Sequence, residues 1–171
     1  MRVLVIRHAI AEDRVEFART GKSDDERPLT SEGECRMRQA ARGLRTLVPT
    51  IDLMASSPLT RARQTAEIVR DAYRELPVEI VPALSGDGDL DGVVAWLAEH
   101  MDLDTTAVVG HEPDLSSLIS YLLTGSGAAA VTMKKGAVCQ LEFADAVEPG
   151  RAVLRWLLAP KHLRSLGRDD A

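Results

Sequence analysis

Short apolar runs and stretches of helical periodicity alternate along most of the chain. Continuous apolar runs rich in β-branched residues are typical of strands buried on both faces of a parallel sheet. Apolar residues that recur every three or four positions predict amphipathic helices. The predicted strands are residues 2–6, 53–56, 78–84 and 106–110. The predicted helices are residues 31–48, 57–73, 90–100 and 115–124.

Local signals predict where some of these helices begin and end. Ser31-Glu32-Gly33-Glu34 fits a capping box at the first residue of its helix. Ser57 followed by Pro58 fits an N-cap with proline at the first helical position. Gly125 fits the end of the helix 115–124. Residues 11–28 are polar and without periodicity, so we expect a loop there.

The C-terminal part has a different pattern. Residues 131–134, 137–143 and 152–158 are predicted to be strands with little helix between them. Pro160 would end the last strand, and we expect residues 161–171 to be a charged tail that frays.

Alternation of strand and helix predicts βαβ units and therefore an α/β fold. We expect a three-layer sandwich with a mainly parallel sheet, helices on both faces and an antiparallel edge from the C-terminal strands. The chain has 171 residues, which is the size of one ordinary domain. We expect residues 1–160 to form a single catalytic domain.

Composition narrows the classes of protein. Hydrophobic residues are 45% and charged residues 27%, which is typical of a globular protein and not of a disordered one. The net charge of -5 argues against a nucleic-acid partner. The apolar run 1–6 is too short for a signal peptide or a membrane span. Cys35 and Cys139 form no metal or redox motif, so we expect reduced thiols in a cytoplasmic protein, and we expect a monomer.

Three of the predicted strands are followed by unusual polar residues. Arg7 and His8 follow the first strand, Arg61 comes one turn into the helix after the second, and His111 follows the fourth. Because the carboxyl ends of parallel strands meet at one edge of a sheet, we expect these side chains to lie together. Two guanidinium groups, two imidazoles and a helix N-terminus suit a phosphate group.

The same arrangement predicts that His8 is a nucleophile. To attack phosphorus, its imidazole must be neutral with one bare nitrogen, and nearby guanidinium charges should lower its pKa. His8 would take the phosphoryl group, and water would then release it. Arg7, Arg61 and His111 would stabilise the charge on the transferring oxygens.

Four motifs in this order resemble those of the histidine phosphatase (phosphoglycerate-mutase-like) superfamily. Arg7-His8-Ala9 is similar to its Arg-His-Gly signature, with Ala in place of the commoner Gly. Leu29-Thr30-x-x-Gly33 is similar to its helix start after the first loop. Residues 57–66 resemble its second-arginine motif, and residues 109–113 resemble its second-histidine motif. The resemblance implies a nucleophilic histidine, a phosphate-binding shell of the residues just named, and no metal or other cofactor.

Within the superfamily, the short length and two segments resemble the small phosphohistidine phosphatases of the SixA type. These segments are Arg27-Pro28-Leu29-Thr30 and Trp156-Leu157-Leu158-Ala159-Pro160. The long insertion that carries the acidic proton donor of the mutases is missing, and only residues 85–89 stand in its place. We therefore expect an open, shallow pocket that admits a phosphorylated side chain of a partner protein.

The sequence leaves four candidates for the proton donor. The candidates are Glu112, Asp13, Asp24 and Asp87, with Glu112 as the possible general acid. His100 and His162 lack any motif and are expected at the surface. Lys134-Lys135 is expected to be a solvated pair, with an anionic partner as the other possibility.

Four other functions compete with a phosphohistidine phosphatase. The first is a phosphomonoesterase acting on a small sugar or nucleotide phosphate. The second is a non-catalytic module that binds a phosphorylated partner, although binding alone would not require a bare imidazole among arginines. A metallohydrolase is disfavoured because two arginines would repel a divalent cation and no carboxylate-rich ligand set is present. A mutase is disfavoured by the missing insertion.

Overall fold

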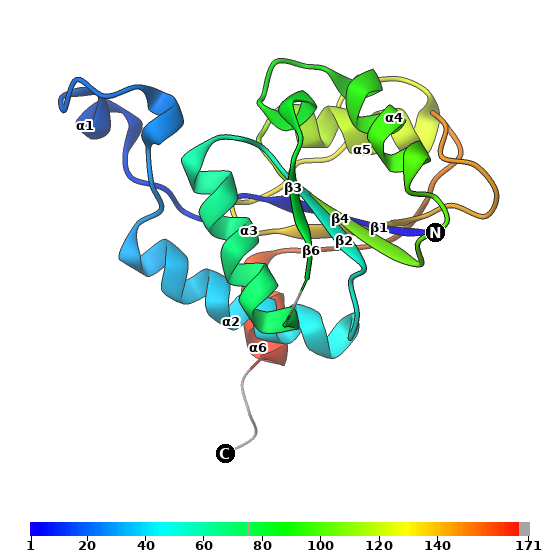
Figure 1. Ribbon diagram of the computed structural model, residues 1–171, viewed down its shortest axis with the longest axis horizontal. Helices are drawn as coiled ribbons and strands as arrows, with labels where there is room; N and C mark the ends of the chain where they lie inside the picture. Colours follow the sequence, from blue (N-terminus) through cyan, green and yellow to red (C-terminus); the bar gives the residue numbers. More distant parts are fainter. Residues whose placement is uncertain (75, 168–171) are drawn as a thin grey trace.

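The computed structural model describes residues 1–74 and 76–167 and has a mixed sheet between two layers of helices (Figure 1). The sheet has six strands in the order β3-β2-β4-β1-β5-β6. β1 pairs parallel with β4, β4 with β2 and β2 with β3, whereas β5 and β6 add an antiparallel edge. The strands are β1 (Arg2–Arg7), β2 (Leu53–Ser56), β3 (Val78–Ile80), β4 (Thr105–Gly110), β5 (Val138–Glu142) and β6 (Val153–Leu158). The predicted α/β class and its antiparallel edge are confirmed.

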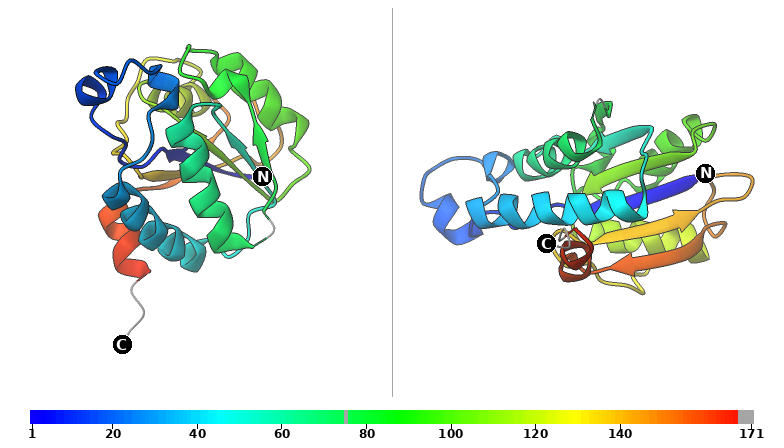
Figure 2. Two further views of the ribbon diagram at one scale, coloured as in Figure 1. Left: turned by 60° about the vertical axis from the view of Figure 1, so that its left-hand side comes forward. Right: turned by 90° about the horizontal axis from the view of Figure 1, so that it is seen from below.

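Helices cover both faces of the sheet (Figure 2). One face packs against α2 (Ser31–Leu47), α3 (Thr60–Tyr73) and α6 (Pro160–Leu166). The other face packs against α4 (Leu90–Glu99) and α5 (Asp114–Thr124). The chain also forms α1 (Arg14–Ala18) and the 3₁₀ turns η1 (Asp24–Glu26) and η2 (Pro82–Leu84). Within the described residues, no helix is both long and apolar enough to cross a membrane.

The first strand shows why its sequence is a continuous apolar run. Leu4 and Ile6 belong to the core cluster under α2 and α3, whereas Val3 and Val5 belong to the cluster under α4 and α5. All four side chains are fully buried. Since successive side chains of a strand point to opposite faces, burial on both faces requires apolar residues at every position.

The helix starts differ from the sequence expectations by a few residues. Thr30, and not Ser31, caps α2, because its hydroxyl accepts from the Gly33 N–H at 2.9 Å. Ser57 does not cap α3, which begins at Thr60 after a turn. Gly125 ends α5 in the left-handed conformation, as predicted.

Other expected elements are replaced. Residues 131–134 do not form a strand, and the strand expected at 78–84 ends at Ile80 because Pro82 begins a 3₁₀ turn. The loop expected at 11–28 contains α1 and η1, whose N-caps are Asp13 and Ser23.

The expected frayed tail is wrong for residues 161–166. They belong to α6, where Leu163 is fully buried in the core cluster under α2. Gly43 of α2 permits this packing, since an added Cβ there would collide with the carbonyl oxygen of Leu163. Residues 168–171 of the expected tail lie outside the described residues.

Candidate active site

The carboxyl ends of β1, β2 and β4 meet at one edge of the sheet, because β4 lies between the other two strands. Arg7 ends β1 and His8 follows it, Arg61 lies in the first turn of α3, and His111 follows β4. These four side chains line one cavity of about 250 Å³. The remaining residues that line the cavity are Arg14, Asp24, Arg27, Ser85, Gly86, Glu112 and Lys135. The structure therefore brings together the four residues that sequence analysis selected for phosphate chemistry.

The His8 ring is fixed by a hydrogen bond to the next residue. Its Nδ1 lies 2.7 Å from the Ala9 carbonyl oxygen, which can only accept a hydrogen bond. Nδ1 must therefore carry the proton, and Nε2 of the neutral ring is bare. Burial is the main cause that lowers the pKa of His8 to about 3, and the nearby His111, Arg61 and Arg7 lower it further, against the Ala9 hydrogen bond. Sequence analysis required one bare ring nitrogen but did not identify the group that binds the other.

Two contacts hold the loop that follows His8. The Thr65 hydroxyl accepts from the Ala9 N–H at 3.0 Å and donates to the Arg61 carbonyl at 2.7 Å, so it joins the loop to α3. Gly33 of α2 packs directly on this loop, since an added Cβ would collide with the Ile10 carbonyl oxygen. These contacts give a physical reason for the small residue in the Leu-Thr-x-x-Gly motif.

His111 is held beside His8. The centroids of the two rings lie 5.1 Å apart. The Nε2 atom of His111 lies 2.7 Å from the Ser57 hydroxyl oxygen, which also accepts from the Leu59 N–H at 3.2 Å. Burial and the neighbouring Arg61 lower the pKa of His111 to about 4. Ser57 is thus the residue that orients His111, a role different from the predicted helix cap.

Arg61 is buried, Arg7 is half-buried, and both are incompletely hydrogen-bonded. Arg7 donates from Nη1 to the Met133 carbonyl at 2.5 Å, and Arg61 donates from Nη1 to the Asp24 carbonyl at 2.9 Å. Among the described residues, buried side-chain atoms without a hydrogen-bond partner include Arg7 Nε, Arg61 Nε, His111 Nδ1 and Glu112 Oε1. Because buried polar groups are normally paired, their concentration in one cavity is typical of a binding site for a polar ligand.

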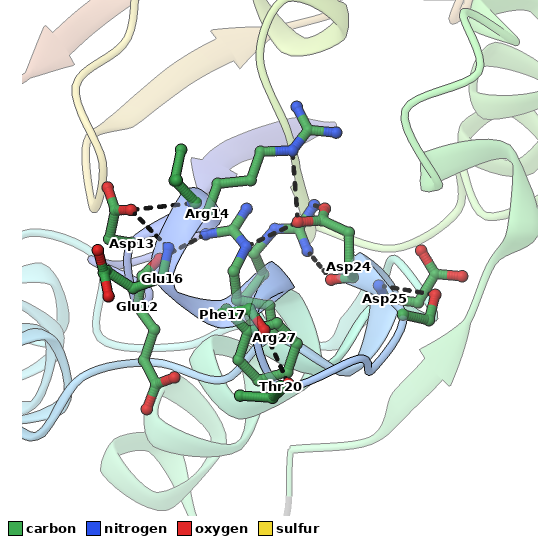
Figure 3. Close-up of polar contacts among 12 residues, drawn as sticks. Glu12, Asp13, Arg14, Glu16, Phe17, Thr20, Asp24, Asp25 and Arg27 are labelled. Atoms are coloured by element: carbon green, nitrogen blue, oxygen red, sulfur yellow. Dashed lines mark hydrogen bonds and ion pairs between the residues drawn. The ribbon is translucent and has the colours of Figure 1, made fainter.

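A cluster of ion pairs from the loop 11–28 forms one wall (Figure 3). The Asp24 carboxylate lies 2.8 Å from Arg27 Nε, 3.3 Å from Arg61 Nη2 and 3.5 Å from Arg14 Nε. Arg27 also donates to the Glu12 carbonyl at 2.8 Å and is buried. The hydrogen bond from Arg27 is the main cause that lowers the pKa of Asp24.

The structure separates the four candidate proton donors. Asp13 is exposed and caps α1, and neither Asp13 nor Asp87 lines the cavity. Asp24 lines it but is held ionised by three arginines. Glu112 lines it, and its Oε2 accepts from the Ser116 hydroxyl at 2.6 Å. Glu112 is therefore the candidate with both access to the cavity and a free carboxylate oxygen.

Sequence analysis missed three cationic residues of the cavity. Arg14 and Arg27 come from the loop 11–28, and Lys135 comes from the segment before β5. Arg27 was part of a family-like segment, and Lys135 was part of a lysine pair for which an anionic partner was the second possibility, but Arg14 had no local signal. His100 and His162 lie outside the cavity, and His162 is exposed, as expected.

A larger hollow of about 670 Å³ lies between α2 and α3, away from this chemistry. Its lining consists of Arg38, Arg42, Arg45, Thr46, Ile68, Asp71, Ala72 and Arg74. It contains no histidine and no nucleophile, so size alone does not mark the site. Among the described residues, no group of three or more His, Cys, Asp and Glu side chains could hold a metal ion.

Comparisons with known proteins agree on the family. A family model described as histidine phosphatase superfamily (branch 1) matches residues 3–86. The phosphohistidine phosphatase SixA of Escherichia coli (strain K12) is 30% identical over 168 residues, which cover 96% of this chain and 97% of SixA. The chain belongs to the histidine phosphatase superfamily, and it is a SixA-like phosphatase of that superfamily.

Solved structures support the same assignment. The structure of the protein histidine phosphatase SixA complexed with tungstate is similar with a TM-score of 0.81 and 28% identity, covering 95% of this chain and 99% of that one. The α-ribazole phosphatase from Shigella flexneri shares the fold with a TM-score of 0.73 at 22% identity, covering 94% of this chain and 97% of that one. The fold is thus shared by phosphatases whose names indicate a protein substrate and a small-molecule substrate.

Proposed function

We propose that this protein is a metal-independent phosphatase that forms a phosphohistidine intermediate on His8 and removes phosphate from phosphohistidine of a partner protein. The observation that carries the proposal is the state of the His8 ring. Its Nδ1 is bonded to the Ala9 carbonyl, and its lowered pKa keeps Nε2 unprotonated at neutral pH. A bare imidazole nitrogen between Arg7 and Arg61 suits attack on phosphorus.

The reaction would proceed in two displacements. His8 Nε2 attacks the phosphorus of the substrate, the bond from phosphorus to the substrate imidazole breaks, and that imidazole takes up a proton. Water then attacks the phosphoryl group on His8, which releases inorganic phosphate and restores the neutral ring. Arg7, Arg61 and an imidazole N–H of His111 would stabilise the three phosphoryl oxygens in both steps.

Glu112 is the proposed proton donor to the leaving group. It lines the cavity beside Arg7, and one of its carboxylate oxygens is buried without a partner in the described part of the chain. In the second step the same carboxylate would accept a proton from the attacking water. A phosphohistidine substrate places little demand on this residue, since imidazole leaves readily once it is protonated.

Two observations support a protein substrate. The similarity to SixA covers almost the whole chain, and SixA is named a phosphohistidine phosphatase. On one side, Ser85 and Gly86 of a short loop line the cavity in place of the long insertion of the mutases, which suits a phosphorylated side chain of a partner protein. The fold shared with an α-ribazole phosphatase favours the alternative, a small sugar or nucleotide phosphate.

We also infer that the chain forms a single catalytic domain, in which residues 1–160 carry every residue of the cavity and α6 adds Leu163 to the core. A cytoplasmic location suits the thiols of Cys35 and Cys139, which are both free. A phosphohistidine-bearing protein of a signal-transduction chain would be a partner of the required chemistry.

The test compares three substrates in the presence of EDTA: a phosphohistidine protein, p-nitrophenyl phosphate and a set of sugar phosphates. We expect the fastest phosphate release from phosphohistidine, and a loss of at least about a thousandfold in His8→Ala. His162→Ala is the matched control, because His162 is exposed on α6 and should leave the rate unchanged. Cleavage of a sugar phosphate alone, still dependent on His8, would favour the small-molecule alternative.

The binding-module alternative makes a different prediction. It expects wild-type protein to bind phosphate or a phosphopeptide without releasing phosphate from any substrate. Quenching in alkaline SDS, which preserves the acid-labile bond between phosphorus and the His8 nitrogen, separates the cases, since only the phosphatase transfers radioactive phosphate to His8. A complete lack of labelled protein together with tight phosphate binding would contradict the catalytic proposal.

A further inference from the structure

The cavity holds more positive charge than one phosphoryl group requires. Five cationic side chains and two carboxylates line it, so a bound phosphoryl dianion leaves one positive charge uncompensated when Glu112 is ionised and two when Glu112 is protonated as the proton donor. The cationic residues are Arg7, Arg14, Arg27, Arg61 and Lys135, and the carboxylates are Asp24 and Glu112. Four like charges around a fifth are unfavourable unless a further anion joins them.

Arg7 and Lys135 are the two cations of the cavity outside the Asp24 cluster, and Glu112 is the carboxylate that acts on Arg7. Asp24 pairs with Arg14, Arg27 and Arg61. Among the described residues, no carboxylate lies within ion-pair distance of the Lys135 ammonium. Its pKa is lowered by burial first and then by Arg7 and Arg27, against the charge of the Asp13 carboxylate, and the residue is exposed to solvent. These shifts agree with a position on the wall of the cavity.

The backbone fixes Lys135 next to the nucleophile. The N–H of the following residue, Gly136, lies 3.1 Å from both the Arg7 and the His8 carbonyl oxygens. Gly136 has a φ of +78°, which a glycine adopts without strain. Two residues before Lys135, the Met133 carbonyl accepts from Arg7. The segment from 133 to 136 is therefore bound to Arg7 and His8 on both sides of Lys135.

We propose that Lys135 is a specificity-determining residue that binds a carboxylate of the partner protein, located next to the phosphorylated histidine. This inference rests on the proposed function and names the substrate more closely. A surplus of one or two positive charges calls for a further anionic group, and a carboxylate side chain next to the phosphorylated histidine supplies one. A cavity of about 250 Å³ has room for a phosphoryl group and its imidazole. The second anion therefore lies at the mouth, where the lysine is exposed.

The experiment uses phosphohistidine peptides that differ at one position. The neutral parent peptide carries Gln at the two positions before and the two positions after phosphohistidine. Each of four variant peptides carries Glu at a different one of these four positions. We expect the wild-type protein to prefer a Glu peptide over the parent by about fivefold in kcat/KM at low ionic strength, through KM. Lys135→Gln should abolish this preference, so that the ratio of kcat/KM for the Glu peptide to kcat/KM for the parent falls to about 1.

Lys134→Gln is the matched control. It removes the same charge from the neighbouring residue, which is exposed and does not line the cavity. It should keep the preference for Glu. Equal kcat/KM for all five peptides in the wild-type protein would overturn the inference, and so would a preference that Lys134→Gln and Lys135→Gln reduce equally.

A binding arm separates this inference from the proposed function. The same five peptides are made with a non-hydrolysable phosphonate analogue of phosphohistidine, and their affinities are measured by calorimetry. If no phosphohistidine peptide is hydrolysed but a Glu analogue binds more tightly through Lys135, the proposed catalysis fails and the carboxylate site stands. If the peptides are hydrolysed without any dependence on Glu, the catalysis stands and the carboxylate site fails.

Discussion

Asp24 contacts Arg61 at two points, one through the backbone and one through the side chain. The Asp24 carbonyl accepts from Arg61 Nη1 at 2.9 Å, and its carboxylate lies 3.3 Å from Nη2. The backbone contact orients the guanidinium group without adding negative charge, whereas the carboxylate competes with any anion for the same group. The loop 11–28 thus both positions a proposed phosphate-binding arginine and reduces its attraction for phosphate.

Asp24→Asn should therefore strengthen phosphate binding. The variant keeps the backbone contact and removes one negative charge from the wall of the cavity. We expect the inhibition constant of inorganic phosphate to fall about threefold to tenfold at low ionic strength. Asp102→Asn is the control, since Asp102 is exposed and precedes the start of β4, at the end of that strand opposite the cavity. Weaker phosphate binding in Asp24→Asn would mean that the carboxylate is needed to hold Arg61.

The imidazoles of His8 and His111 should stay neutral between pH 5 and pH 8. Burial lowers their pKa values to about 3 and about 4, and the site arginines act in the same direction. ¹⁵N NMR of the side chains can check this, with His8→Gln and His111→Gln to assign the signals. We expect a proton on Nδ1 of His8 and none on Nε2. A protonation midpoint near 6.5 for His8 would contradict the prediction.

These lowered pKa values also predict how stability depends on pH. Below about pH 6.5 the histidines of the unfolded chain bind protons, whereas those of the folded protein stay neutral down to about pH 3–4. The contribution of these histidines to the free energy of unfolding is therefore fully present above pH 6.5. It is lost as the pH falls toward the pKa values of the folded protein. Urea unfolding at pH 7 and pH 5 should show a loss that is smaller in His8→Gln by up to about 2 kcal/mol. An unchanged loss would contradict a neutral, buried His8.

The edge of the sheet that holds the site could be predicted from sequence because parallel strands impose a common direction. Once β1, β2 and β4 are recognised as buried strands, Arg7, Arg61 and His111 must meet. The Ala9 carbonyl that fixes the His8 ring could not be predicted, since it depends on the backbone path of a loop. The contacts of Asp24 could not be predicted either, since its three arginine partners come from the loop 11–28 and from α3.

The failed element predictions have a common physical cause. Residues 131–134 have strand-like composition, but Met133 binds Arg7 through its carbonyl and Ala137 N–H bonds to the Lys134 carbonyl at 2.8 Å, so the segment turns instead of pairing. Residues 161–166 are mostly charged or polar. One buried apolar residue, Leu163, holds their helix against α2, whereas Leu166 is exposed. In both segments long-range contacts outweigh local preference.

Two glycines of α2 offer a paired test of how the fold positions the site. An added Cβ at Gly33 would collide with the Ile10 carbonyl beside the His8 loop, whereas one at Gly43 would collide with the Leu163 carbonyl of α6. Both Gly→Ala variants should lose about 2–4 kcal/mol of unfolding free energy, because backbone must move in each case. Below the melting temperature, Gly33→Ala should also lower kcat/KM at least about tenfold by displacing His8. Gly43→Ala should retain wild-type kcat/KM, since its clash lies at the other end of the helix. Equal activity of the two folded variants would show that the contact between α2 and Ile10 does not position the nucleophile.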